Sequence, residues 1–223
     1  MSKVALLLVG SPKAKRSTSE VLGGYVLDEL QKNGFKTEKE NVHRLLKADN
    51  GSEKLIKLVN TCDILIFSSP LYIDSIPAPV VRAMEIIAES KREQNQSNKQ
   101  LMLAITNCGF PEASHNHLAL DIYKHFAKEA GFEWVGGLAL GGGGTIGGQP
   151  LTKFGRMTKN IIKSLDLTTF ALLNGNMIPE EAIKLMEKPM VPNWLYILVG
   201  HHGWRTAAKK YGVHQKLNNQ PYK

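Results

Sequence analysis

The stretch Val4-Ala-Leu-Leu-Leu-Val-Gly-Ser-Pro-Lys-Ala-Lys-Arg-Ser-Thr-Ser-Glu20 decides the fold of this chain. It opens with an unbroken apolar run, Val4–Val9, which is short enough for a strand buried on both faces, as in a parallel sheet. Gly10-Ser11-Pro12 ends that run, and from about Thr18 the apolar positions recur at helical spacing. The pattern predicts a strand, a polar loop and the beginning of a helix.

The polar loop between this strand and this helix has the chemistry of an anion site. Free backbone N–H groups and the positive end of the helix dipole favour an anion at such a turn. Hydroxyl and cationic side chains add donors there, and they are Ser11, Lys13, Lys15, Arg16, Ser17, Thr18 and Ser19. An ordinary N-cap cluster on a solvated basic loop would have the same composition. Taken alone, the loop leaves both interpretations open.

The chain as far as residue 173 alternates predicted strands with predicted helices. Further strands are expected at 35–45, which is polar and near a sheet edge, and at 63–67, 101–106 and 132–140. Helices are expected at 52–60, 80–90, 118–130 and 152–173. The alternation predicts an α/β fold with an open, doubly wound, five-stranded parallel sheet. The loops that follow the strands then meet at one edge of the sheet, where ligands bind.

Residues 141–148 are rich in glycine, and Gly142, Gly144 and Gly147 match the pattern G-x-G-x-x-G. After the following helix, however, no strand and no ribose-binding acid comes at the distance that a dinucleotide loop needs. We therefore interpret this segment as a flexible lid or as closely packed backbone.

Residues 174–223 are predicted to form a helical C-terminal extension to a first domain, 1–173. The segment 193–211 carries Trp194 and Trp204, and from Lys188 to the last residue there are six Lys or Arg and no Asp or Glu. This combination suits a membrane surface or a partner, although such helices more often pack on their own domain or on a second subunit. We expect the segment to serve assembly or a substrate lid, in a homodimer.

Composition restricts the class of protein. The net charge of +8 favours anionic ligands without identifying them. The two cysteines, Cys62 and Cys108, form no CxxC or Cys/His cluster, which indicates a reducing compartment and no zinc or iron–sulfur site. The apolar run at the N-terminus is too short for a signal peptide, and no segment is long enough to span a bilayer. The basic residues are spread along the chain, so nucleic-acid binding is not expected. These features predict a soluble cytoplasmic protein.

Three of the predicted loops differ in chemistry and converge at the same edge of the sheet. The first offers donors for a phosphate, the second a flat apolar surface around Tyr72, and the third an amide and exposed backbone. Together the loops would suit a ligand with a phosphate at one end and a planar polar ring at the other, as in flavin mononucleotide, FMN. The second and third loops contribute Pro70, Leu71, Tyr72, Ile73, Asn107, Cys108, Gly109 and Phe110. For Tyr72 or Phe110 considered singly, packing in the core is the simpler interpretation.

Gly10-Ser-Pro-Lys with Ser17-Thr-Ser, followed by Pro70-Leu-Tyr-Ile-Asp-Ser-Ile-Pro-Ala, resembles the NAD(P)H-dependent FMN reductases of the flavodoxin-like superfamily. The resemblance covers roughly residues 1–150. It implies that Ser11, Lys13 and the turn at 16–19 hold the FMN phosphate, and that residues 70–73 and 107–110 flank the isoalloxazine. Flavodoxins proper tend to be shorter and acidic, and the cysteine motif of the iron–sulfur flavoproteins is absent from this sequence.

The resemblance implies an oxidoreductase in which electrons pass from NADH or NADPH through bound FMN to a small-molecule acceptor, such as a quinone, a nitro compound or a flavin. No side chain need act as a general acid or base. His115 and His117 are interpreted as solvated caps, and Cys108 as a small side chain without redox chemistry. Two alternatives remain open: an FMN-binding electron carrier without NAD(P)H turnover, and a binding protein that has lost the flavin.

Overall fold

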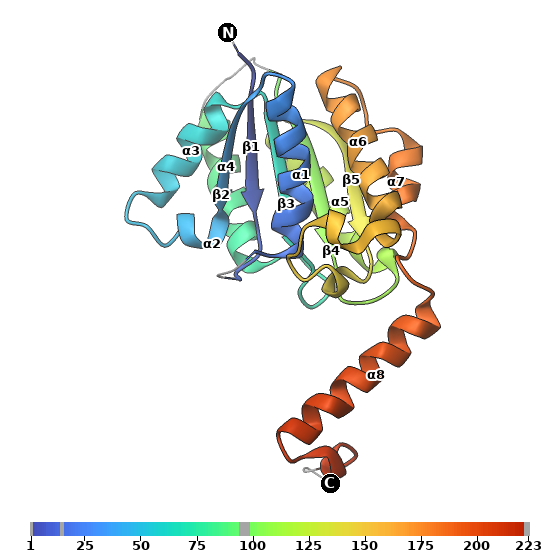
Figure 1. The fold of residues 1–223 in the computed structure, drawn as a ribbon. Helices are drawn as coiled ribbons and strands as arrows, with labels where there is room; N and C mark the ends of the chain where they lie inside the picture. Colours follow the sequence, from blue (N-terminus) through green and yellow to red (C-terminus); the bar gives the residue numbers. More distant parts are fainter. Residues whose placement is uncertain (1, 14–15, 94–98, 221–223) are drawn as a thin grey trace.

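The computed structural model describes residues 2–13, 16–93 and 99–220. Lys15, expected in the anion loop, and residues 94–98, between the helix expected at 80–90 and the strand expected at 101–106, lie outside them. The strands form one parallel sheet in the order β2-β1-β3-β4-β5 (Figure 1). Their bounds are β1 (Val4–Val9), β2 (Lys36–Asn41), β3 (Ile64–Pro70), β4 (Leu101–Asn107) and β5 (Glu133–Leu140). The predicted five-stranded doubly wound sheet is confirmed, and its strand order is that of the flavodoxin-like folds.

The polar strand at the edge of the sheet is shorter than expected. The sequence predicts one strand over 35–45, but β2 ends at Asn41 and the short helix α2 (Val42–Leu45) follows. The reason is an N-cap, because the Asn41 side chain accepts a hydrogen bond from the Arg44 backbone N–H at 3.1 Å. The edge position of β2, next to β1, is as predicted.

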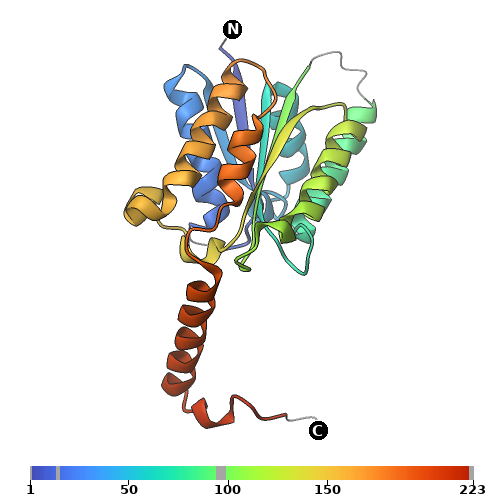
Figure 2. The ribbon, with the colours of Figure 1, turned by 90° about the vertical axis from the view of Figure 1, so that its right-hand side faces the viewer.

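Helices cover both faces of the sheet (Figure 2). Side chains of β1 alternate between the two faces, so Leu6 and Leu8 enter one buried cluster and Leu7 and Val9 enter the other. The first cluster includes residues of α3 (Gly51–Thr61), α4 (Ala78–Glu93) and α5 (His117–Glu129). The second includes residues of α1 (Thr18–Lys32), α6 (Lys159–Leu173) and α7 (Glu180–Glu187).

The helix expected over 152–173 is divided in two. A 3-10 segment, η3 (Leu151–Thr158), comes first, and the regular helix α6 begins only at Lys159. The break lies at Gly155, whose φ of 52° is in the left-handed region, where helical hydrogen bonding cannot continue. Other short 3-10 turns are η1 (Ala113–Asn116), η2 (Gly143–Thr145) and η4 (His214–Lys216).

The C-terminal residues divide into a packed part and a projecting part. Ile178, Ala182 and Met186, in and before α7, are buried in the cluster against β5 and α6. The next helix, α8 (Asn193–Lys210), leaves the body and projects into solvent (Figures 1 and 2), and Ala208 is its one buried residue. The domain boundary expected after Leu173 stays a prediction. None of the helices in the described ranges is long and apolar enough to cross a membrane.

Candidate functional site

A pocket of about 200 Å³ opens at the carboxyl edge of the sheet. The loops after β1, β3 and β4 meet there, as the topology of a parallel sheet requires. It brings together most of the predicted site residues: Ser11, Lys13, Ser17, Thr18, Ser19, Pro70, Leu71, Tyr72, Asn107, Cys108 and Gly109. Arg16, Ile73 and Phe110 are not part of its lining.

One end of the pocket is the N-terminus of α1. The Ser17 hydroxyl oxygen accepts a hydrogen bond from the Glu20 N–H at 3.1 Å, and the Ser17 carbonyl accepts one from the Val21 N–H at 3.0 Å. The N–H groups of Thr18 and Ser19 precede the first closed turn of the helix, so no intrahelical acceptor exists for them. The Ser17 cap leaves its own hydroxyl proton to donate. This end of the pocket therefore offers the donors and the dipole that an anion requires.

Hydrogen bonds from buried side chains join the N-terminus of α1 to β3 and β4 below the pocket. Asn107 Nδ2 donates to Ser19 Oγ at 2.8 Å and to the Ser69 carbonyl at 3.1 Å. Ser68 Oγ donates to the Ser19 carbonyl at 2.7 Å. The Asn107 amide, predicted to flank the flavin ring, thus also fixes the position of the phosphate end relative to β3 and β4.

The second loop turns sharply at the mouth of the pocket. The backbones of Tyr72 and Ser75 exchange two hydrogen bonds, at 2.8 and 3.1 Å. The two residues between them, Ile73 and Asp74, have φ values of 50° and 55°, which describe a type I′ turn. A β-branched residue at positive φ is strained, and the Ile73 side chain is 99% exposed. Tyr72 lines the pocket at 44% exposure, so it is not a core residue.

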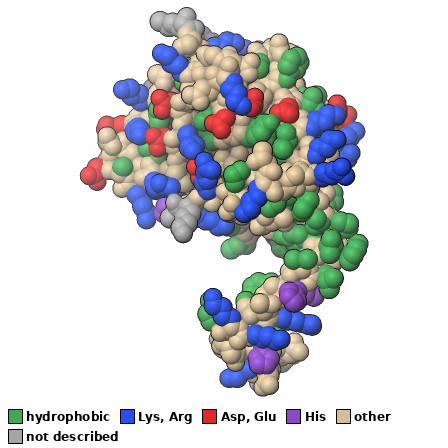
Figure 3. Space-filling view, viewed as in Figure 1, with side chains coloured by type: hydrophobic (Ala, Val, Ile, Leu, Met, Phe, Trp, Pro, Cys, Tyr) green, Lys and Arg blue, Asp and Glu red, His purple; other side chains and the backbone are tan. Residues whose placement is uncertain are grey.

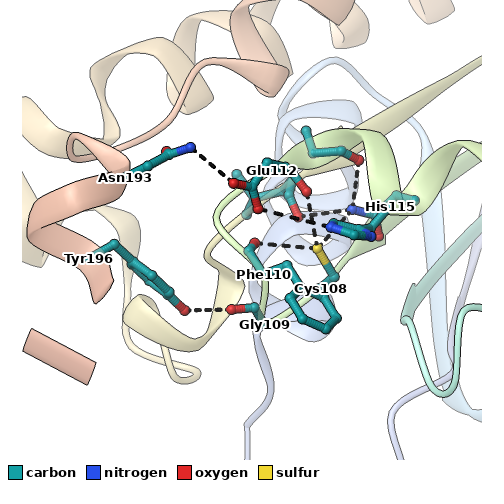
Figure 4. A network of polar contacts seen from close by, with 10 residues as sticks. Cys108, Gly109, Phe110, Glu112, His115, Asn193 and Tyr196 are labelled. Atoms are coloured by element: carbon teal, nitrogen blue, oxygen red, sulfur yellow. Dashed lines mark hydrogen bonds and ion pairs between the residues drawn. The ribbon is translucent and has the colours of Figure 1, made fainter. Parts of the chain in front are cut away.

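The remaining predicted residues lie outside the pocket. Arg16 lines a separate groove of about 280 Å³ along α1, with Tyr25 and Asp28. Phe110 is 54% exposed and stacks on His115 with ring centroids 4.5 Å apart (Figure 4), so it is not in the core either. His117, expected as a solvated cap, has its Nε2 2.8 Å from Glu187 Oε1. Contacts of Arg16, Ile73 and Phe110 with a cofactor stay predictions.

The Cys108 thiol belongs to a network of polar contacts with residues of its own loop (Figure 4). Its Sγ lies 3.4 Å from the Phe110 carbonyl and accepts a hydrogen bond from Asn116 Nδ2 at 3.3 Å. Burial raises the pKa of the Cys108 thiol, so the sulfur is neutral and a poor nucleophile. Burial raises the pKa of Cys62 to about 12 as well. No group of His, Cys, Asp or Glu in the described ranges is arranged to hold a metal ion.

The glycine-rich loop after β5 forms a further wall of the pocket, through Gly143, Gly144 and Gly147. Gly143 is held on both sides, since its N–H donates to the Cys108 carbonyl and its carbonyl accepts from Thr18 Oγ1, each at 2.8 Å. A Cβ added at Gly148 would lie 2.1 Å from the Arg16 carbonyl oxygen. Of the two interpretations of this loop, closely packed backbone is therefore the one observed. The place of this loop in the site is not predicted from the sequence, although the run of glycines directly after a buried strand is a signal for it.

The sequence of this chain matches the family model of NADPH-dependent FMN reductases over residues 3–128. The chain belongs to this family. Membership makes it a flavin-dependent oxidoreductase, with FMN as the cofactor and NAD(P)H as the electron donor that the family indicates. No curated protein matches the sequence.

Solved structures of flavoproteins share the fold. An NADH:FMN oxidoreductase in its apo form superposes with a TM-score of 0.58 at 16% identity, over 86% of this chain and 97% of that one. The NAD(P)H:quinone oxidoreductase from Methanothermobacter marburgensis superposes with a TM-score of 0.53 at 14% identity, over 64% of this chain and 85% of that one. An azoreductase from Bacillus anthracis str. Sterne superposes with a TM-score of 0.51 at 14% identity, over 78% of this chain and 100% of that one. At these identities the likeness confirms the fold alone.

Proposed function

We propose that this protein oxidises NADH or NADPH through bound FMN and passes the electrons to a small-molecule acceptor. The observation that carries the proposal is the division of the pocket into two chemically different ends. Anion donors lie at the N-terminus of α1, and an apolar wall with exposed backbone lies at the loops after β3 and β4.

The donor end fits the phosphate of FMN. A phosphate there would accept hydrogen bonds from the Thr18 and Ser19 N–H groups and from the hydroxyls of Ser11 and Ser17. Lys13, which lines the same pocket, adds a positive charge. Ser17 is only 4% exposed, so its bond to a phosphate would form largely out of water, where charge-assisted hydrogen bonds are stronger.

The other end fits the isoalloxazine ring. Pro70, Leu71 and Tyr72 supply the apolar side, and the backbone of residues 107–109 and of the glycine-rich loop supplies polar atoms without bulk. FMN, when bound, supplies hydride and electron transfer, and the protein supplies position and shielding. The side chains that line the pocket in the described ranges include no carboxylate and no imidazole. This lining suits flavin chemistry better than a hydrolytic mechanism, which would need a general base.

The acceptor that we propose is a small planar molecule such as a quinone, a nitro compound or a free flavin. Tyr72 lies at the pocket with almost half of its surface exposed, and Ile73 is fully exposed at the same turn. An apolar rim of this kind would contact a planar aromatic ring that approaches the flavin from solvent. The same exposed rim would suit coverage by a second subunit, and the expected homodimer remains a proposal that light scattering tests.

The decisive experiment is an absorbance spectrum of the purified protein, recorded before and after anaerobic addition of NADPH or NADH. We expect the bands of an oxidised flavin, and we expect them to bleach with the donor and return with a quinone. A protein that binds FMN but is not reduced by either nucleotide would favour the electron-carrier alternative. A protein with no measurable affinity for FMN would favour the alternative in which the fold has lost its flavin.

A further inference from the structure

The helix α8 is the part of the described chain that its own domain covers least. Its polar contacts with the domain come from its first turn (Figure 4): Tyr196 Oη donates to the Gly109 carbonyl at 2.7 Å, and Asn193 Nδ2 donates to Glu112 Oε1 at 3.1 Å. Beyond that turn the helix runs away from the body (Figures 1 and 2). Most of its large apolar side chains are left 49–74% exposed, and they are Trp194, Ile197, Leu198, Val199, Trp204 and, just after the helix, Tyr211.

Four of these side chains form one stripe along α8. Trp194, Ile197, Trp204 and Tyr211 are spaced by three and seven residues, which keeps them on the same side of a helix with 3.6 residues per turn. Tyr196, which attaches the helix to the domain, lies about 100° around the helix from the middle of this stripe. The stripe therefore lies to one side of the Tyr196 attachment, and at 1.5 Å per residue it extends for about 25 Å.

Positive charge accompanies the stripe toward the tip of the helix. Arg205 and Lys209, one turn apart, line a cavity of about 290 Å³ with His214, Leu217 and Asn218. From Lys188 onward the chain has six Lys or Arg and no acid, which leaves 22 basic and 20 acidic residues before it. Figure 3 shows apolar side chains near the domain and basic ones at the tip. Four of these cations, Arg205, Lys209, Lys210 and Lys216, lie within 193–217, so this one projecting segment carries a charge of +4 out of the net +8.

We propose that residues 193–217, α8 and the turn after it, bind an anionic lipid surface. Trp and Tyr side chains favour the interface between lipid and water, and Lys and Arg are attracted to anionic headgroups. Because no described helix can cross a bilayer, the segment would lie on the surface, with the aromatic stripe toward the lipid. A second copy of this chain fits the charge less well, since the segment has no carboxylate to pair with its own cations. This inference does not depend on the flavin chemistry.

The test is flotation of the full-length protein with vesicles of phosphatidylcholine alone and with vesicles that also contain phosphatidylserine. We expect binding to the second kind only, weakened by salt. The variant R205Q/K209Q/K210Q should bind roughly a hundredfold more weakly, because each cation contributes to attraction by an anionic leaflet. Trp204→Ala should also weaken binding. The matched control K57Q/K124Q/K128Q removes the same charge from exposed positions on the body and should bind normally.

Three results would overturn the proposal. The first is no preference for vesicles with phosphatidylserine, and the second is an equal loss of binding in the body control. The third is a protein that does not bind vesicles but is a dimer by light scattering. If Trp204→Ala then makes it a monomer, the stripe is the interface with a second copy. Thermal melts of each variant show that a loss of binding does not come from unfolding.

Discussion

The replacement Gly148→Ala tests whether the glycine-rich loop holds the phosphate end of the pocket in place. Gly148 has a φ of 83°, and a Cβ added there would lie 2.1 Å from the carbonyl oxygen and 2.7 Å from the carbonyl carbon of Arg16. Both atoms are backbone, so no side-chain rotation can relieve the overlap. The loop or the turn at 16–17 must shift until the contact exceeds 3.0 Å, the shortest that real Cβ atoms make. That turn carries Ser17, the N-cap of α1.

Gly34→Ala is the matched control. Gly34 closes α1 with a φ of 89°, close to that of Gly148, but an added Cβ would meet no described atom within 4 Å. At either position, alanine at positive φ lowers the free energy of unfolding by about 1–2 kcal/mol. The reduced conformational freedom of the unfolded chain raises it by about 0.4–1 kcal/mol at both positions. The difference between the two variants therefore isolates the overlap with Arg16.

Urea unfolding of the flavin-free protein and titration with FMN measure the two consequences. We expect Gly34→Ala to lose about 1 kcal/mol of unfolding free energy and to keep its affinity for FMN. Gly148→Ala should lose about 2–4 kcal/mol and bind FMN at least about tenfold more weakly, because the Ser17 turn moves. Equal losses of stability in the two variants, with unchanged affinity for FMN in both, would refute the reasoning.

Further predictions concern the pocket and the buried thiol. Replacing Ser17 and Ser19 together by Ala should weaken FMN binding by at least about tenfold, and the unaltered protein should bind riboflavin poorly; equal affinities for riboflavin and FMN in a fluorescence titration would contradict the phosphate assignment. Tyr72→Ala should change turnover and loosen FMN with little change in melting temperature, because Tyr72 is 44% exposed; a loss of about 3–5 kcal/mol with normal flavin affinity would indicate a core residue after all. Tyr196→Phe removes the donor to the Gly109 carbonyl and should weaken FMN binding several-fold, whereas Tyr211→Phe on the same segment should not; indistinguishable titrations would mean that the contact does not position the flavin loop. Because burial raises the pKa of Cys62 from 9.0 to about 12, the unfolded state loses its thiol proton first, so stability should be unaffected below pH 9 and fall between pH 9 and 12. In Cys62→Ala, the free energy of unfolding measured in urea should fall less between pH 9 and 12. An unchanged fall would mean that the Cys62 thiol is not its cause.

The sheet and the main loops of the site could be predicted because their signals are local. The apolar run Val4–Val9 is buried almost completely on both faces, so its sequence reports its environment directly. Parallel topology then determines that the loops after β1, β3 and β4 meet, without knowledge of any side chain. The same reasoning does not give the direction of single side chains, so it predicts cofactor contacts for Arg16, Ile73 and Phe110, which lie outside the lining of the pocket.

The glycine-rich wall was missed for a different physical reason. Gly143 and Gly147 line the pocket with backbone atoms, and a run of glycines in a sequence indicates close packing without showing what packs there. Their importance depends on tertiary neighbours such as Thr18, far away in the chain. The exposure of Tyr72 and Phe110 could not be predicted either, because aromatic residues are typical of cores. The strained turn at 73–74 holds Tyr72 at the surface.

The packing of α7 has a consequence for solubility. A strand at the border of a sheet exposes unpaired backbone groups, which invite other chains to add to it. β2 is protected at one border by its charged side chains, among them Lys36 and Glu38, which are exposed. β5 is apolar instead, and at the other border the Ile178 N–H donates to the Val135 carbonyl at 2.8 Å as the chain enters α7. A protein shortened after Leu173 would uncover this border and should aggregate, whereas one shortened after Met190 keeps it covered.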